Sequence, residues 1–481
     1  MICNNQNLER AMASKPSPFY YIYVSYWKMK LLITKACIII LLFAFTSAVA
    51  QQKSLQLPTG NDVNAVIDKI RDNKAISADS AFQALSQWSD YPVIQKTGYD
   101  YLYYFSDPFY GVVPVRVYVP VNYNRSRKSV CVLLLHGGTG GSKFADIDSL
   151  NKFDDDILFS SLKKQDYIII RPVAENKKKF NWSVNMFSGQ DKNATNLTFQ
   201  TLTNIVISIK KVLNIDDNKV FAMGHSDGSD GAIGLGVYSP NLFAAYVAYN
   251  SMFTNIFARD FYIRNILNVP LYTVHSDLDD LRPIQQTRII IDELSKTSGN
   301  ILYKEYIGYQ HYDKHLDKDL PFTPLFINST SRNPFQTLLM WETYRPDIYN
   351  MCRWLKITGV DTASVVSDWY RPLNFKSYDK RSKQYFKDRE YYYKLNKCSA
   401  IKASYNNNVF NIQSYRVKKL VISVNPVMVN LEQPVIVNLN GKKVFEGKIT
   451  ADKRFLTESF KIDFDRGNIC VNEIRIKTGK E

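Results

Sequence analysis

Short apolar runs alternate with amphipathic stretches through the middle of the chain. Helical periodicity falls between or after several of the runs, at residues 202–213, 284–294 and 335–355. Continuous apolar strands that alternate with helices predict a parallel sheet covered on both faces, which is an α/β architecture. The runs lie at residues 130–135, 167–170, 220–223, 244–248, 270–274 and 302–307, and two further strands are expected at 101–105 and 112–119.

The pattern differs at the two ends of this region. Weak helical periodicity over residues 60–95 predicts a small N-terminal helical cap. Beyond Trp369 the pattern becomes that of short strands, with Asn440-Gly441 as a type I′ hairpin signal. We therefore expect a helical cap over 51–100, an α/β catalytic domain over 101–375 and a β-rich module over 376–481.

The first fifty residues predict a secretory leader. Lys30 and Lys35 form a basic segment, residues 36–45 are apolar, and Ala48-Val49-Ala50 is typical of a signal-peptidase site. The apolar run is about half of the roughly 20 residues that span a bilayer. We expect translation to start at Met29, with residues 1–28 an upstream extension, and cleavage after Ala50 to give a secreted or periplasmic protein.

Charge is distributed unevenly along the chain. The net charge is +16, of which residues 376–481 contribute +11 and residues 51–375 only +1. A nucleic-acid-binding protein concentrates positive charge on its working face, so no nucleic-acid partner is expected for the central region. The basic C-terminal module is instead expected to hold the protein near an anionic surface, such as envelope lipid or acidic glycan. A solvated basic face with a structural role is the alternative.

The four cysteines after the leader offer no metal or redox motif, because none are spaced as C-x-x-C. Export permits a disulfide, and Cys398 with Cys470 is the pair expected if one forms. Buried free thiols are an equal alternative, and for Cys131, inside an apolar run, the favoured one.

Residues 224–228 read Gly-His-Ser-Asp-Gly, which is G-x-S-x-G after an apolar run and before a helix start rich in small residues. In that context the motif predicts a nucleophile elbow, with Ser226 on a tight and strained strand-to-helix turn. The glycines are needed because side chains beside the serine would collide with neighbouring backbone.

A second glycine-rich segment follows the apolar run at 130–135. It reads His136-Gly137-Gly138-Thr139, as an oxyanion loop requires, since backbone N–H groups must reach a developing anion without side chains in the way. The partner donor is expected to be the N–H of Asp227. Phosphate binding is disfavoured, because neither a dinucleotide-binding nor a P-loop motif is present.

A serine nucleophile needs a histidine base and usually a carboxylate that orients it. Of the five histidines, His311 follows the last core strand directly and is preferred over His315, which we expect at the surface or in a cap. The loop after residues 270–274 offers three acids, whose spacing does not fit a calcium loop. These acids are Asp277, Asp279 and Asp280.

The order of serine, acid and histidine is that of the α/β-hydrolase family, and residues 118–355 resemble its members. Residues 118–123 and 214–216 resemble segments of secreted esterases similar to polyhydroxybutyrate depolymerases and feruloyl esterases, and the C-terminal module resembles the β-rich tail of some of them. Residues 275–283 resemble that group's His-Gly-x-x-Asp-x-x-Val-Pro, which implies Asp279 as the acid. Two departures, Ser276 and Arg282, leave Asp277 as an alternative.

The resemblance implies a serine carboxylic-ester hydrolase that works through an acyl-enzyme and needs no metal or organic cofactor. Gly138 and Asp227 would supply the oxyanion N–H groups. A serine peptidase of the prolyl-oligopeptidase kind and an inactive binding protein with a hydrolase fold are the alternatives. The residues expected around the substrate are His136, Thr139, Trp182 and Tyr309, with Phe180 and Phe187 as further aromatics of the same loop. Ordinary core packing under a long loop is an equal alternative for these aromatics, and Tyr309 and Tyr312 beside His311 are open in the same way.

Overall fold

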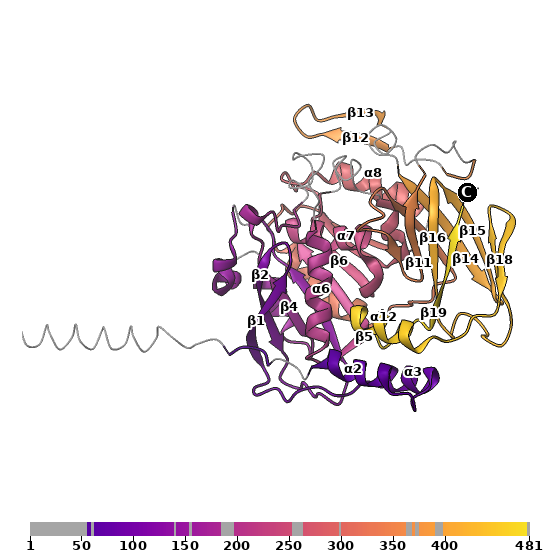
Figure 1. Ribbon diagram of the computed structural model, residues 1–481. Coiled ribbons are helices and arrows are strands. Elements are labelled where there is room, and N and C mark those ends of the chain that lie inside the picture. The colour runs from indigo at the N-terminus through magenta and orange to yellow at the C-terminus, as the bar shows by residue number, and fades with distance from the viewer. Residues whose placement is uncertain are drawn as a thin grey trace, which may run out of the picture. The chain divides into compact units, whose positions relative to one another are not determined.

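An eight-stranded sheet forms the centre of the structure (Figure 1). The computed structural model describes residues 55–58, 62–138, 141–152, 156–183, 197–252, 263–297, 300–361, 368–370, 375–389 and 398–478. The leader and its cleavage site lie outside these residues. The strands of this sheet are β1 (Tyr99–Asp107), β2 (Gly111–Val119), β3 (Ser129–Leu135), β4 (Ile168–Pro172), β5 (Ile215–His225), β6 (Ala245–Tyr249), β7 (Leu271–Ser276) and β8 (Ile301–Tyr306).

The strand order is β1-β2-β4-β3-β5-β6-β7-β8. Only β2 runs against its neighbours, and all pairs from β4 to β8 are parallel. This order and direction, with a strand-to-helix turn after β5, define the α/β-hydrolase fold. The fold class predicted from the apolar runs is confirmed.

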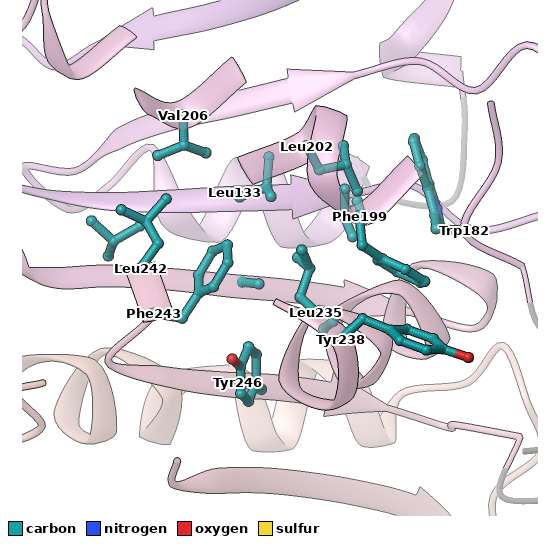
Figure 2. Packing of buried hydrophobic residues seen from close by; sticks show 14 of the residues in the cluster. Leu133, Trp182, Phe199, Leu202, Val206, Leu235, Tyr238, Leu242, Phe243 and Tyr246 are labelled. Atoms are coloured by element: carbon teal, nitrogen blue, oxygen red, sulfur yellow. The ribbon is translucent and has the colours of Figure 1, made fainter. Parts of the chain in front are cut away.

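Helices cover both faces of this sheet, because alternate residues of each strand point to opposite sides. On one face, Leu133 packs with residues of α6 (Thr198–Lys210), α7 (Asp227–Tyr238) and α8 (Ile284–Ser295). Figure 2 shows Leu133 with Leu202 and Phe199 from α6 and Leu235 from α7. On the other face, Leu134 packs with residues of α4 (Asp156–Leu162), α9 (His315–Asp319) and α10 (Thr323–Ser329).

Two further sheets enclose a core of their own toward the C-terminus. One has the order β18-β17-β15-β14-β9 and the other β10-β11-β16-β19. Trp341, Trp354, Ile422 and Val437 lie in the core of this sandwich. The strands are β9 (Leu338–Thr343), β10 (Met351–Cys352), β11 (Leu355–Val360), β14 (Ser399–Asn406), β15 (Val409–Tyr415), β16 (Val417–Val424), β17 (Val435–Leu439), β18 (Lys442–Gly447) and β19 (Asn472–Lys477), and a separate hairpin is formed by β12 (Phe375–Asp379) and β13 (Gln384–Arg389).

The sandwich begins near Leu338, so the boundary expected between residues 375 and 376 is wrong. The helix expected over residues 335–355 is also wrong, because this segment forms β9 and β10 and reaches the start of β11. β9 pairs with β14 and β11 pairs with β16, so their partners lie far along the chain. The periodicity of a short segment cannot reveal a partner strand that lies far along the chain. Packing against such a partner determines β structure more than local preference does. The expected hairpin turn is confirmed, with positive φ at Asn440 and Gly441.

The two ends of the described chain meet in one helical cluster. Helices α2 (Val63–Asp72) and α3 (Ala78–Ser86) confirm the N-terminal helices predicted from the sequence. They pack against α12 (Lys453–Asp463), which lies beside them in Figure 1 and which the strand pattern of the C-terminal segment did not predict. Ile67, Leu85 and Trp88 share this core with Leu456 and Phe460.

Buried ion pairs join the residues after α12 to the start of β5. The Arg466 Nε lies 2.7 Å from Asp217 Oδ2, and the Lys210 Nζ lies 2.8 Å from Asp217 Oδ1. Arg332 and Asp465 form a second pair at 2.6 Å. Burial alone would raise the pKa of Asp465, but Arg332 outweighs it and lowers that pKa to about 2. The sandwich is thus fixed to the central sheet by charges that water does not screen.

The four described cysteines are free thiols, so the disulfide considered between Cys398 and Cys470 is not formed. The Cys398 thiol instead lies 3.3 Å from the Tyr370 hydroxyl. In the part of the chain that the structure describes, no helix is long and apolar enough to cross a membrane.

Candidate active site

Ser226 occupies a sharp turn between β5 and α7. Its φ of 57° and ψ of −125° lie in a region that a residue with a side chain rarely adopts. A Cβ on Gly228 would lie 1.9 Å from the carbonyl oxygen of Leu135, and one on Gly224 would lie 2.3 Å from the carbonyl carbon of Gly228. Only glycine therefore permits strand, turn and helix to approach this closely, as the motif predicts.

Three side chains from three loops form a continuous hydrogen-bonded row. The Ser226 Oγ lies 2.8 Å from His311 Nε2, and His311 Nδ1 lies 2.6 Å from Asp279 Oδ2. Ser226 follows β5, His311 follows β8 and Asp279 follows β7. The carboxyl ends of these parallel strands lie at one edge of the sheet, which brings the three side chains together. All three are buried, at 5%, 4% and 3% exposure. The structure thus juxtaposes the three residues selected from the sequence.

Asp279, and not Asp277, faces the histidine. Its Oδ1 accepts the backbone N–H of Arg282 at 2.8 Å, and its Oδ2 accepts the Asn250 amide at 2.7 Å. Burial would raise the pKa of Asp279, but the hydrogen bonds from His311 and Asn250 outweigh it and lower the pKa to about 2. The carboxylate is therefore ionised at neutral pH. Asp277 instead accepts the backbone N–H of Gly308.

Asn250, at the end of β6, is a site residue that the sequence analysis did not identify. Its amide nitrogen donates to Asp279 Oδ2 and to Ser276 Oγ, both at 2.7 Å, and its amide oxygen lies 2.8 Å from His315 Nε2. His315 is fully buried behind the acid, so its expected place at the surface is wrong. The only signal in the sequence was that Asn250 is a polar residue at the end of β6, the strand next to β7, which leads to the acid. No motif marks this position.

We expect Asn250→Ala to lower kcat about tenfold, because a hydrogen bond to a charged group contributes about 1.5 to 3 kcal/mol and orients the carboxylate. Ester hydrolysis by the purified variant checks this. His315→Gln, whose amide N–H can still donate to Asn250, is the control and should fall less. Equal losses in the two variants would contradict the assigned role of Asn250.

The two residues expected to supply the oxyanion N–H groups, Gly138 and Asp227, lie close together. Gly138 is so close to the nucleophile helix that a Cβ on it would lie 3.2 Å from Asp227 Oδ2. Asp227 is the first residue of α7, where backbone N–H groups are directed out of the helix. The loop after β3 and the first turn of α7 therefore border the same point beside Ser226, where an oxyanion would be stabilised.

His136 and Trp182 support the oxyanion loop, so the expected place of His136 around the substrate is wrong and the alternative of core packing holds for Trp182. His136 Nδ1 lies 2.7 Å from the Gly137 carbonyl oxygen, and its Nε2 accepts the Ala174 N–H at 3.0 Å. The Trp182 ring packs edge-on against His136 and its N–H donates to the His136 carbonyl at 2.9 Å. Both side chains are buried, and main-chain groups use both nitrogens of the imidazole. Phe180 is buried in the same core.

Tyr309 and Thr139 complete the set expected around the substrate. Tyr309 is half-buried and packs against Tyr306 and His315, on the side of the acid. Thr139 and Phe187 lie outside the described residues. Two further rings contact the base. Tyr312 is half exposed and its ring lies edge-on to His311. His225 packs on His311 and contacts its carbonyl oxygen, which was not predicted.

Buried neutral histidines should make the site sensitive to acid. Burial lowers the pKa of His136 to about 4, against about 6.5 in an unfolded chain, and does the same for His275. Between pH 6.5 and 4 the unfolded chain then binds more protons at these residues, so they make stability fall as the pH falls. Urea unfolding at a series of pH values gives the slope of the unfolding free energy against pH. We expect this slope to be smaller in His136→Gln than in the wild type over this window, by the equivalent of about one bound proton. Identical dependence would contradict the buried neutral state.

Fold and site together define a protein with the α/β-hydrolase fold, in which a serine, a histidine and an aspartate form one hydrogen-bonded row. Neither a protein-family model nor a curated protein matches the chain. Solved structures do resemble it. One is a thermostable esterase, 20% identical, with a TM-score of 0.40 over 48% of this chain and 63% of that one, so the match spans less than two thirds of the esterase.

Two other matches differ in the activity that their names state. An S-formylglutathione hydrolase from Agrobacterium tumefaciens is 12% identical, with a TM-score of 0.38 over 49% of this chain and 96% of that one. The dipeptidyl peptidase 4 of Porphyromonas gingivalis is also 12% identical, with a TM-score of 0.36 over 49% of this chain and 36% of its own. At such identities the function must be inferred from this chain's own side chains.

Proposed function

We propose that the protein is an exported serine hydrolase that cleaves a carboxylic ester. The observation that supports this is the row from Ser226 through His311 to Asp279, with hydrogen bonds of 2.8 and 2.6 Å. A serine hydroxyl becomes a useful nucleophile only when a neighbouring base accepts its proton, and the base needs a fixed tautomer. Asp279 provides this by accepting a hydrogen bond from the N–H of His311 Nδ1, which leaves Nε2 free to act on Ser226.

The reaction follows from these positions. The Ser226 Oγ attacks the ester carbonyl carbon while its proton passes to His311 Nε2, and the resulting oxyanion is stabilised by the N–H groups of Gly138 and Asp227. The carbon–oxygen bond then breaks, and the alcohol leaves with the proton from His311. Water, deprotonated by the same nitrogen, attacks the acyl-enzyme and releases the acid with Ser226 restored. Each step uses only side-chain and backbone groups of this chain.

Comparison of ester and amide substrates tests the proposal. We expect the protein to hydrolyse p-nitrophenyl acyl esters faster than aminoacyl p-nitroanilides. Faster amide cleavage would replace the esterase by a serine peptidase, and no turnover of either, with no labelling by a fluorophosphonate, would indicate a binding protein without catalysis. A series of esters of increasing acyl length, together with feruloyl and acetylated-sugar esters, would then define the substrate class.

Export is part of the proposal and is supported by the sequence of the leader. N-terminal sequencing of the protein recovered outside the cytoplasm should begin at Gln51, directly after Ala50. Recovery only in the cytoplasm, or with residues 29–50 still attached, would contradict it.

We further propose that the C-terminal sandwich binds an anionic surface through an exposed basic strip. Lys419 of β16 is directly opposite Lys477 of β19, and both are exposed. Two cations on one exposed face attract an anion more strongly than either does alone. Truncation at Phe375 does not test this, because β9 and β11, which belong to the sandwich, would remain without their partners.

We expect Lys419→Glu/Lys477→Glu to lose salt-sensitive retention on anionic vesicles or acidic polysaccharide, while ester hydrolysis stays unchanged. Sedimentation with each material in low and high salt measures this. Lys402→Glu/Lys442→Glu, on the other sheet of the sandwich, is the control with the same net charge. Equal retention of the wild type and of both double variants would contradict the proposal and would mean that Lys419 and Lys477 have a structural role only.

A further inference from the structure

Arg282 is a buried arginine that bridges two acids of the nucleophile helix. Its guanidinium lies 2.6 Å from Asp230 Oδ1 and 2.5 Å from Asp227 Oδ1, and the residue is only 4% exposed. Both acids belong to the first turn of α7, directly after Ser226. Arg282 itself precedes α8, in the loop that carries the triad acid. The residue is one of the two departures from the esterase motif noted in the sequence.

The backbone of Arg282 also contacts the acid loop. Its N–H donates to Asp279 Oδ1 at 2.8 Å, and its carbonyl oxygen lies 2.7 Å from His275 Nε2, at the end of β7. One residue therefore joins the loop of the acid to the turn of the nucleophile. A planar guanidinium can bridge two carboxylates through two different nitrogens, which the single nitrogen of an ammonium group cannot do.

The charge of Asp227 makes this bridge important for the chemistry. The Asp227 side chain is 24% exposed, and its Oδ2 lies beside Gly138, where the oxyanion would form. An unpaired carboxylate there would repel the developing negative charge. The neutral carbonyl of a bound ester carries little charge, so the repulsion would act mainly on the transition state.

We propose that Arg282 is a positioning residue that neutralises Asp227 beside the oxyanion and holds the first turn of α7 against the acid loop. This inference rests on the proposed function, because it assigns a role in the same hydrolytic step. It predicts that Arg282 affects kcat and the binding of tetrahedral anionic analogues, and leaves KM nearly unchanged.

Steady-state hydrolysis of p-nitrophenyl acetate tests the role. We expect Arg282→Met to lower kcat about 100-fold with KM changed less than about threefold, and to weaken inhibition by phenylboronic acid in parallel. Removing the acid as well, in Arg282→Met/Asp227→Asn, should restore kcat at least about tenfold, because the repelling charge is gone. Arg288→Met is the matched control, since Arg288 lies on α8 with its side chain 49% exposed and pairs with Glu305 at the surface. It should keep full activity.

The outcomes separate this role from a structural one. The inference is overturned if a folded Arg282→Met keeps the kcat of the wild type. It is also overturned if kcat falls in Arg282→Met and does not recover in Arg282→Met/Asp227→Asn. Thermal unfolding shows whether Arg282→Met is folded. If it is not, Arg282→Lys and Arg282→Lys/Asp227→Asn replace the pair, with an expected loss of about tenfold and recovery by the second change. A wild type without Ser226-dependent hydrolysis would overturn the proposed function itself, whereas an active wild type with an unaffected Arg282 variant overturns only the inference.

Discussion

Replacement of Ser226 by alanine is expected to lower kcat for ester hydrolysis by about 10⁴-fold or more, because no acyl-enzyme can form without the Oγ. The hydrogen bond of 2.8 Å to His311 would be lost, and the base would have no nucleophile to activate. Alanine meets the same backbone strain at φ 57° as serine does, so the fold should be kept. Burst kinetics with a p-nitrophenyl ester measure the loss.

A fluorophosphonate probe gives an independent readout of the same change. It should label the wild type and fail to label Ser226→Ala. Ser208→Ala is the control, because Ser208 lies on α6 and contacts Tyr103, away from the triad. Equal labelling of Ser226→Ala and the wild type would mean that another residue is the nucleophile.

Replacement of Arg466 by methionine is expected to lower the free energy of unfolding by about 3 to 5 kcal/mol, since it removes one partner from a buried ion-pair cluster. The guanidinium contacts Asp217, which is 1% exposed, and Asn214 Oδ1 at 2.8 Å. It also donates to the carbonyl oxygens of Trp88 and Ile215. A methionine side chain would leave all of these acceptors buried and short of a donor.

Urea unfolding of the purified protein measures this change. Arg475→Met is the matched control, because Arg475 lies on β19 with its side chain 79% exposed and pairs with Glu473. Its effect should stay within about 0.5 kcal/mol, as for most surface substitutions. A change below 1 kcal/mol for Arg466→Met would show that the cluster does not fix the sandwich to the central sheet.

Local patterns predicted the centre of the fold and the triad because both depend on short stretches of sequence. A buried parallel strand is a continuous apolar run, and the turn around Ser226 requires glycine at two fixed positions. His311 could be selected because it follows the last predicted strand, and the ends of parallel strands meet at one edge of the sheet. The same argument left three acids open for the triad, and Asp279 was preferred only because residues 275–283 resemble the esterase motif. The spacing of His311 and Asp279 in three dimensions follows from the strand order.

Other features depend on residues that are far apart in the chain. β9 is a strand because it pairs with β14, some sixty residues later, and its apolar positions fit a helix equally well. Asn250, His315 and Arg282 acquire their roles from neighbours on other loops, and each is an unremarkable polar residue in its own segment. His136 and Trp182 lie on expected loops, but only the packing shows that they face the core.

The cluster around Arg466 also constrains the order in which this chain can fold. Asp217 is synthesised about 250 residues before Arg466, and helices α2 and α3 precede their partner α12 by an even longer stretch. A ribosome that still holds residues 453–466 therefore holds a protein in which Asp217 lacks Arg466 and the first two helices expose their apolar faces. Residues 453–466 supply both sets of contacts, so a cut before Lys453 would remove Arg466 from Asp217 and α12 from the first two helices together.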